Sequence, residues 1–199
     1  CGKPETYEMM DEIVKKGKIK YYGVSVEKVS EAIDAIQYKN VKSIQIIFNI
    51  FRQKPKEIFF KQAKKNNVAI IARVPLASGL LTGKMSMNSF FPKNDHRNYN
   101  INGEAFDVGE TFSGIDFTRG VEAVNELKKI LPDGISLTDL SLRWILSHPE
   151  ISVVIPGAKN KIQAKQNTIA SDLNNISYLD DSILEIYEKY IKDDIHYKW

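Results

Sequence analysis

Cysteine is almost absent from this sequence of 199 residues, in which Cys1 is the single thiol. One cysteine excludes an internal disulfide framework and a zinc site built from cysteines, and it fits a reducing compartment. Long apolar runs are missing too, since no segment approaches the ~20 apolar residues that span a bilayer, and the first residues lack the apolar core of a signal peptide. We therefore expect a cytoplasmic protein without a membrane partner.

The sequence also lacks a strong charge of either sign. Twenty-eight Lys and Arg stand against 25 Asp and Glu, which gives a net charge of +3. Domains that bind nucleic acids gather basic residues on one face. Here the basic runs at 15–18 and 61–65 are short and resemble solvated helix ends. We expect no nucleic-acid partner.

Histidine is scarce, with three in the chain. No two of His96, His148 and His196 have the spacing of metal ligands, so we predict no metal site. We expect His148 to end a helix with its charge near the C-terminal dipole, whereas His96 belongs to a loop and His196 to the tail.

Apolar residues make up 43% of the chain, as in a globular domain with a real core. Four apolar runs rich in β-forming residues predict strands at 19–26, 44–51, 68–74 and 151–155. Helical patterns separate these runs, at about 5–16, 29–36, 55–63, 119–130 and 136–147, and from 160 onward.

Further detail comes from single residues. Ser136 and Asp139 fit a capping box. The final helix is expected to bury one face, made of Ile183, Ile186, Tyr187 and Tyr190. The stretch at about 80–117 has no clear period and predicts a long loop.

The predicted strands are almost continuously apolar, which favours a parallel sheet buried on both faces. Strands and helices alternate, so the fold class is α/β, and about 24 residues per unit match a (β/α) barrel of TIM type. Only four strands are present, which cannot close a barrel in one copy and would leave two unpaired edges. We therefore predict that residues 1–199 form a half-barrel.

Ligand contacts in such barrels come from the C-terminal ends of the strands. Two of these ends, at 73–76 and 156–159, lead into glycine-bearing turns near a lysine. Exposed backbone N–H groups and a lysine suit a phosphate-bearing ligand. The alternative is that proline and glycine only shape the turns.

Four segments, in order, resemble the aldo-keto reductase family. Residues 75–84 resemble the cofactor loop after strand seven of that family, and residues 154–163, followed by Gln166 and Asn167, resemble its strand-eight signature. Residues 17–25 resemble the approach to strand five, and residues 142–146 resemble the helix before strand eight. The resemblance implies that this chain carries strands five to eight and begins in the helix after strand four.

The resemblance also implies an NADP(H) site. Ser25 would bond the nicotinamide carboxamide and Gln45 would be its second amide partner, while Arg73 would pack on the nicotinamide ring in place of a frequent aromatic residue. The loop around the pyrophosphate would contain Pro75, Leu76, Ser78, Gly79, Leu80 and Lys84. The strand-eight signature and adenosine end would contain Gly157, Lys159, Gln163, Gln166 and Asn167, with Lys159 favouring the 2′-phosphate of NADP.

Two positions depart from the family's pattern, because Val26 replaces a frequent polar residue and Gln166 replaces a frequent Glu. Simpler alternatives also exist for three residues of the site. Ser25 and Gln45 would then be buried polar groups satisfied by the backbone, and Lys84 a solvated loop lysine.

The family's catalytic Tyr, Lys, Asp and His lie at the ends of earlier strands, and no strand-end residues here replace them. Tyr21 and Tyr22 enter their strand from the wrong end. We therefore expect no catalytic residue in this chain, which would be an inactive fragment of an oxidoreductase that acts on small-molecule aldehydes or ketones. Its partner would be the missing N-terminal half or a second copy. The alternative functions are a non-catalytic nucleotide-binding module and a self-assembling half-barrel.

A half-barrel would also lose half of its core. The inward-facing set would be Tyr22, Val24, Ile44, Ile46, Ile70 and Val153, or their neighbours one residue away. Exposing several such side chains, at ~1.5–3 kcal/mol each, would leave the isolated chain only marginally stable.

Overall fold

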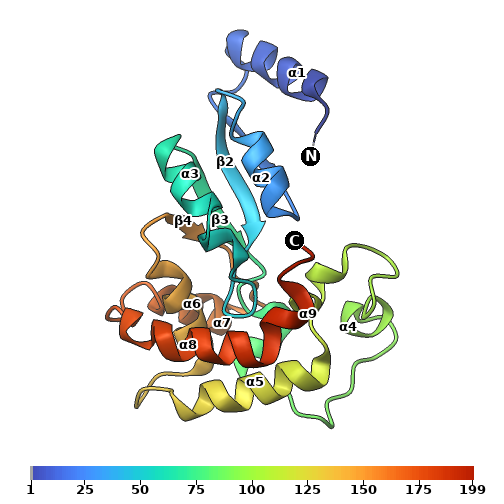
Figure 1. Cartoon of the computed structure of the whole chain (residues 1–199), viewed down its shortest axis with the longest axis vertical. Coiled ribbons are helices and arrows are strands. Elements are labelled where there is room, and N and C mark those ends of the chain that lie inside the picture. Colours follow the sequence, from blue (N-terminus) through green and yellow to red (C-terminus); the bar gives the residue numbers. More distant parts are fainter. Residues whose placement is uncertain (1) are drawn as a thin grey trace.

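The computed structural model describes residues 2–199 and contains one four-stranded sheet (Figure 1). Cys1, on which the thiol argument rests, lies outside the described residues. The strands follow one another in the order β1-β2-β3-β4, and each neighbouring pair is parallel. Their bounds are β1 Tyr22–Ser25, β2 Val41–Ile47, β3 Ala69–Arg73 and β4 Ile151–Val154. The predicted α/β class and parallel sheet are confirmed. Strands β1, β3 and β4 are shorter than their predicted runs, whereas β2 begins at Val41, before its predicted start at 44, and ends at Ile47 and not at 51.

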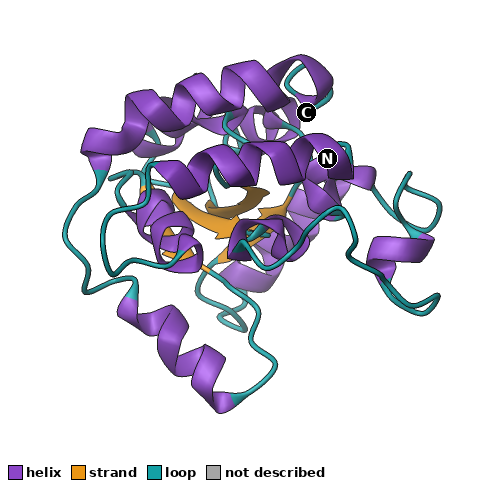
Figure 2. Ribbon diagram, turned by 90° about the horizontal axis from the view of Figure 1, so that it is seen from below, coloured by secondary structure: helices purple, strands orange, loops and turns teal. Residues whose placement is uncertain are grey.

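Helices separate the strands as predicted. They are α1 Pro4–Lys15, α2 Val29–Ala35, α3 Phe59–Lys65, α5 Phe117–Lys129, α6 Leu137–Leu146, α7 Lys161–Ile169, α8 Asp180–Tyr187 and α9 Asp193–Ile195. The 80–117 stretch is mostly irregular, with short turns and the one-turn helix α4 His96–Tyr99. Figure 2 shows the short strands at the centre of the molecule, with helices and long loops around them.

Helix ends follow local chemistry. The predicted capping box is present, because Ser136 Oγ accepts a hydrogen bond from the backbone N–H of Asp139 at 3.2 Å, and the Asp139 carboxylate accepts one from the Ser136 N–H at 3.3 Å. Asn160 caps α7 in the same way, accepting from the Gln163 N–H at 2.9 Å. These caps place the starts of the two helices that flank β4.

The last helical segment differs from its prediction. Ile183 and Tyr187 are buried as expected, but Ile186 and Tyr190 are only half-buried, and the buried face continues through Ile191 and Ile195. A π-helical turn at Glu188–Lys192 lies between α8 and α9. Because an i→i+5 turn adds about one residue to the helical repeat, it changes which residues face the core.

One face of the sheet is packed, and the other is open. Ile44, Ile46 and Ile70 are 0–1% exposed within the core that α2 and α3 also line. The side chains that alternate with them point to the opposite side. Most of this side is open. We call its exposed or half-buried part the open sheet face; it consists of Gly23, Ser25, Ser43, Gln45, Ala69, Ile71 and Val153. Val41, Ile47 and Arg73 alternate onto the same side but are buried.

The expectation that both faces are buried is therefore wrong for the open sheet face, and it holds on that side only at Val41, Ile47 and Arg73. Of the set expected to lose its core, Tyr22, Ile44, Ile46 and Ile70 are buried against helices, and their neighbours form the open sheet face. An apolar run cannot distinguish the two faces, because it places apolar residues on both. No helix among residues 2–199 is long and apolar enough to cross a membrane.

Candidate functional site

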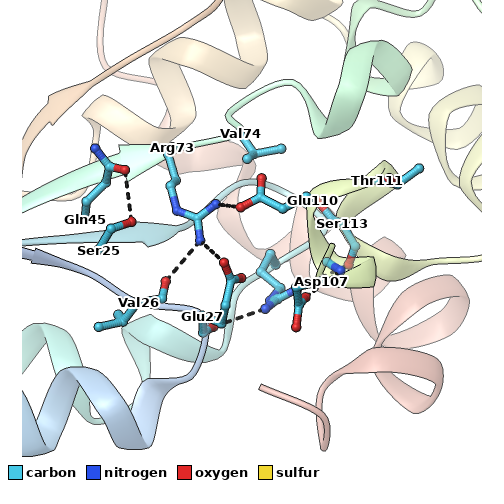
Figure 3. Close-up of polar contacts among 12 residues, drawn as sticks. Ser25, Val26, Glu27, Gln45, Arg73, Val74, Asp107, Glu110, Thr111 and Ser113 are labelled. Atoms are coloured by element: carbon cyan, nitrogen blue, oxygen red, sulfur yellow. Dashed lines mark hydrogen bonds and ion pairs between the residues drawn. The ribbon is translucent and has the colours of Figure 1, made fainter. Parts of the chain in front are cut away.

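Ser25, Gln45 and Arg73 lie on three neighbouring strands toward the C-terminal end of the sheet. Ser25 ends β1 and is paired in register with Gln45 of β2, while Arg73 ends β3 and is paired with Ile47, two residues beyond Gln45. The Ser25 hydroxyl donates a hydrogen bond to Gln45 Oε1 at 3.1 Å (Figure 3). Ser25 is exposed and its partner is a side chain, so the alternative of a buried hydroxyl satisfied by the backbone is wrong for this residue.

Two carboxylates flank the guanidinium of Arg73, whose side chain is 10% exposed. Glu27, from the turn after β1, lies 2.6 Å from Arg73 Nη2. Glu110 belongs to the irregular stretch at 80–117, which we call the long segment, and pairs with Nη1. Nη2 also donates to the Val26 carbonyl at 3.1 Å (Figure 3). Glu27 Oε2 and Arg73 Nε are buried without a hydrogen-bond partner among the described residues.

Burial changes the acidity of this cluster. Desolvation raises the pKa of Glu27 above its ordinary value, and the negative charges of Glu110 and Asp107 add to the effect, whereas Arg73 opposes it. Desolvation lowers the pKa of the nearby Arg52 to about 9, against the attraction of Glu27 and Asp107. The site therefore concentrates charge where little water screens it.

The turn after β3 has a strained backbone. Asn49 Nδ2 holds this turn by donating to the Val74 carbonyl at 2.8 Å. Ser78 Oγ donates to the Glu110 carbonyl at 2.9 Å and accepts from the Phe112 N–H at 3.1 Å. The residues of the turn with φ between 46° and 99° are Val74, Ala77, Ser78 and Gly79. Positive φ at three non-glycine residues persists because the surrounding bonds hold them there, a feature concentrated at functional sites.

The long segment is anchored beside this turn. Asn49 Nδ2 also donates to Ser113 Oγ at 2.9 Å, and Arg52 Nη1 lies 3.4 Å from the Ser113 carbonyl. The Arg52 guanidinium stacks on the Trp199 ring at 3.6 Å, and Trp199 Nε1 donates to Asp107 at 3.2 Å. Residues 107–113 thus connect the ends of β2 and β3 to the C-terminal residue.

The other predicted loop residues lie in or after the same turn. Pro75 and Leu80 are buried, Leu76 is half-buried, and Lys84 is exposed. An exposed lysine fits both the phosphate hypothesis and a solvated loop residue, so the role of Lys84 stays a prediction.

The structure also brings together most of the residues predicted after β4. The Lys159 N–H donates to Gln163 Oε1 at 2.7 Å, and Asn167 Nδ2 donates to the Gly157 carbonyl at 3.2 Å. Gln166 does not join them, because it lines a shallow surface hollow with Lys161, Ile162, Lys165 and Ile169. Gly157, Lys159 and Gln163 are exposed.

Neither strand-entry tyrosine lies in this site. The Tyr22 hydroxyl donates to Asp11 at 2.6 Å, which ties β1 to α1, and Tyr21 is 70% exposed. His148 does end a helix, but its expected charge is wrong, because burial lowers its pKa and favours the neutral ring. Residues 2–199 contain no group of three or more His, Cys, Asp or Glu side chains that could hold a metal ion.

Three residues of the site were not predicted. Glu27 lies two residues after Ser25, just past the end of a strand. Since ligand contacts come from the C-terminal ends of strands, a carboxylate at this position could have been predicted as a site residue. Asn49 follows β2 in the same way. Glu110 lies in the aperiodic segment, where no local pattern indicates which strand end it reaches.

Comparison with known proteins relates this chain to one family. The model of the aldo/keto reductase family matches residues 3–189. The aldo-keto reductase YhdN of Bacillus subtilis is 29% identical over 96% of this chain and 56% of its own length. Aldo-keto reductase yakc [NADP(+)] of Schizosaccharomyces pombe is 27% identical over 77% of this chain and 44% of its own length.

The fold agrees with these matches. The solved glycerol dehydrogenase of Gluconobacter oxydans superposes with a TM-score of 0.74 at 23% identity, covering 94% of this chain and 54% of that chain. The chain thus spans about half the length of the curated relatives it matches. The family model covers most of the sequence, and this chain belongs to the aldo/keto reductase family.

Proposed function

We propose that this chain is the cofactor-binding portion of a cytoplasmic, NADP(H)-dependent oxidoreductase that acts on small-molecule aldehydes or ketones. The observation that carries the proposal is the pairing of Ser25 with Gln45 on neighbouring strands, with Arg73 and the strained turn at the end of the next strand, β3. Family membership and the relative named for NADP(+) support the cofactor.

The residues present fit such a cofactor. An exposed hydroxyl and an amide, already within hydrogen-bond distance of each other, suit the carboxamide of a nicotinamide ring. The planar guanidinium of Arg73 suits the ring face, and the turn at 74–79 presents backbone N–H groups suited to a pyrophosphate. Lys159 would favour a 2′-phosphate. When bound, the cofactor supplies the hydride that a carbonyl carbon receives.

The proposal includes the fragment hypothesis. The open sheet face and the two edge strands fit strands five to eight of a barrel whose other strands come from an N-terminal half or from a second copy. The proton donor and its partners would then come from outside this chain, since among residues 2–199 no tyrosine or lysine lies at a strand end beside Ser25 and Arg73. General acid catalysis requires such a group within hydrogen-bond reach.

A titration with two readouts tests the proposal. We expect NADPH fluorescence to show saturable binding to the folded chain and to weaken about ten-fold in the S25A/Q45A double variant, equivalent to ~1.4 kcal/mol. A variant of the exposed Lys129, on α5, is the control and should bind as the parent does. The same samples should show no carbonyl reduction above background.

Two results would count against the proposal. Absence of saturation at millimolar NADPH, in a chain that circular dichroism shows to be folded, would remove the cofactor assignment. Turnover that copurifies with the chain and falls on mutation of Arg73 would show that the proton donor has been overlooked.

A further inference from the structure

The ion-pair cluster at Arg73 contains more negative charge than the guanidinium needs. One carboxylate is enough to neutralise an arginine, yet Glu27 and Glu110 both contact it, and they come from separate elements (Figure 3). The Glu27 oxygen Oε2 has no hydrogen-bond partner among residues 2–199, and Asp107 is close enough to repel Glu27. Arg52 is the second cation here, since its Nη2 donates to the Glu27 carbonyl at 3.3 Å. Three carboxylates, those of Glu27, Glu110 and Asp107, thus stand against two guanidinium groups, which leaves one unbalanced negative charge.

This surplus matters because the two forms of a nicotinamide cofactor differ in charge at the ring. The oxidised ring is a cation, and the reduced ring is neutral. An arginine alone beside the ring would repel the oxidised form. An arginine held between two carboxylates presents a net negative environment, and this environment attracts the oxidised ring.

Little water screens these charges. The Arg73 side chain is 10% exposed and those of Glu27 and Glu110 are about 30% exposed, so their fields reach a ring packed on the guanidinium with less screening than at an open surface. Desolvation raises the pKa of Glu27, Arg73 opposes this effect, and the negative charges of Glu110 and Asp107 raise the pKa further.

We propose that Glu27 and Glu110 determine the redox state of the cofactor that this site prefers, by reversing the charge that Arg73 alone would present to the nicotinamide ring. The inference rests on the proposed function, since it needs the ring to lie against Arg73. Glu27 and Glu110 are specificity-determining residues in this scheme and exchange no proton with the substrate.

Paired titrations test the inference. The dissociation constants of NADP+ and NADPH are measured by calorimetry for the parent chain and for the variants E27Q and E110Q. We expect each variant to weaken NADP+ binding about ten-fold more than NADPH binding. Glu104 provides the control, because it lies on the same segment as Glu110 but is exposed and accepts a hydrogen bond from Asn102 Nδ2 at 2.8 Å. The variant E104Q should leave the ratio of the NADP+ and NADPH dissociation constants unchanged.

A structural role would give a different result. If the two carboxylates only hold the segment in place, both cofactor forms weaken equally and the ratio stays constant, which would overturn the inference. The variants E27D and E110D keep the charge and should therefore show the parent ratio of the two dissociation constants. If E27Q does not fold, E110Q alone provides the test. Failure of both forms to bind the folded parent chain would overturn the proposed function, and this inference with it.

Discussion

The Asn49 side chain makes three hydrogen bonds at the candidate site, as many as that of Arg73. It is fully buried, donates to the Val74 carbonyl and Ser113 Oγ, and accepts from the Phe51 N–H at 2.8 Å. One amide thus joins the end of β2 to the strained turn and to the long segment. An amide suits this position because it offers donors and an acceptor at once.

We expect Asn49→Ala to lower the free energy of unfolding by about 2–4 kcal/mol, because a buried group that loses its partner costs ~1–3 kcal/mol and several are left here. Urea denaturation measures the change. The matched control is Asn98→Ala, since Asn98 is exposed and makes one side-chain bond, to the Phe91 carbonyl. Equal midpoints for the two variants would contradict this role of Asn49.

At the scale of elements, the long segment depends on a contact with the C-terminal residue. Trp199 is 6% exposed, and its ring packs over Gly109 and Gly114 of the segment. Gly114 has φ of 79°, and a Cβ there would overlap the ring. Glycine is required at this position for two reasons, namely the backbone conformation and the close approach of the indole.

Two glycine substitutions separate these reasons. Gly134 has φ of 76° and nothing within 4 Å of a Cβ, so Gly134→Ala should cost only the backbone strain, about 1 kcal/mol. Gly114→Ala should cost about 1–3 kcal/mol more, because the indole must move. It should also speed proteolysis within residues 84–107. Equal stability of the two variants would mean that Trp199 does not pin the segment.

At the scale of the whole molecule, we expect the open sheet face and the sheet edges to govern association of the chain with a partner. Ser25, Gln45, Ile71 and Val153 form one register row across all four strands, and Val153 of the edge strand β4 is 42% exposed. Unpaired edges next to apolar side chains favour association with other strands. A second copy of the chain is the partner always available in a purified sample.

We expect light scattering to detect dimers or larger species of the isolated chain, and Val153→Lys to reduce them several-fold by placing a charge on the open sheet face. The control is Ile162→Lys, which adds the same charge at a side chain 70% exposed on α7, away from the sheet. A stable, cooperative monomer of the parent chain would contradict this prediction.

Much of the fold follows from local sequence. The apolar runs around Ile44, Ile70 and Val153 indicated the strands, Ser136 and Asp139 indicated a helix start, and the alternation of elements indicated a parallel sheet. Ser25, Gln45 and Arg73, in contrast, were predicted from the resemblance of longer segments to the aldo-keto reductase family. The strands and the helix start are local features. Such features depend on neighbours within a few residues, so the sequence alone determines them.

Tertiary structure decided the rest. Ile44 and Gln45 lie on opposite faces of the sheet, and the positions of the helices decide which face is packed. A run with apolar residues on both faces does not indicate which one. The pairing of Arg73 with Glu27 and Glu110 spans 46 and 37 residues of sequence, and Asn49 reaches Ser113 across 64. Contacts of that range form only when distant segments are brought together, so no local pattern encodes them.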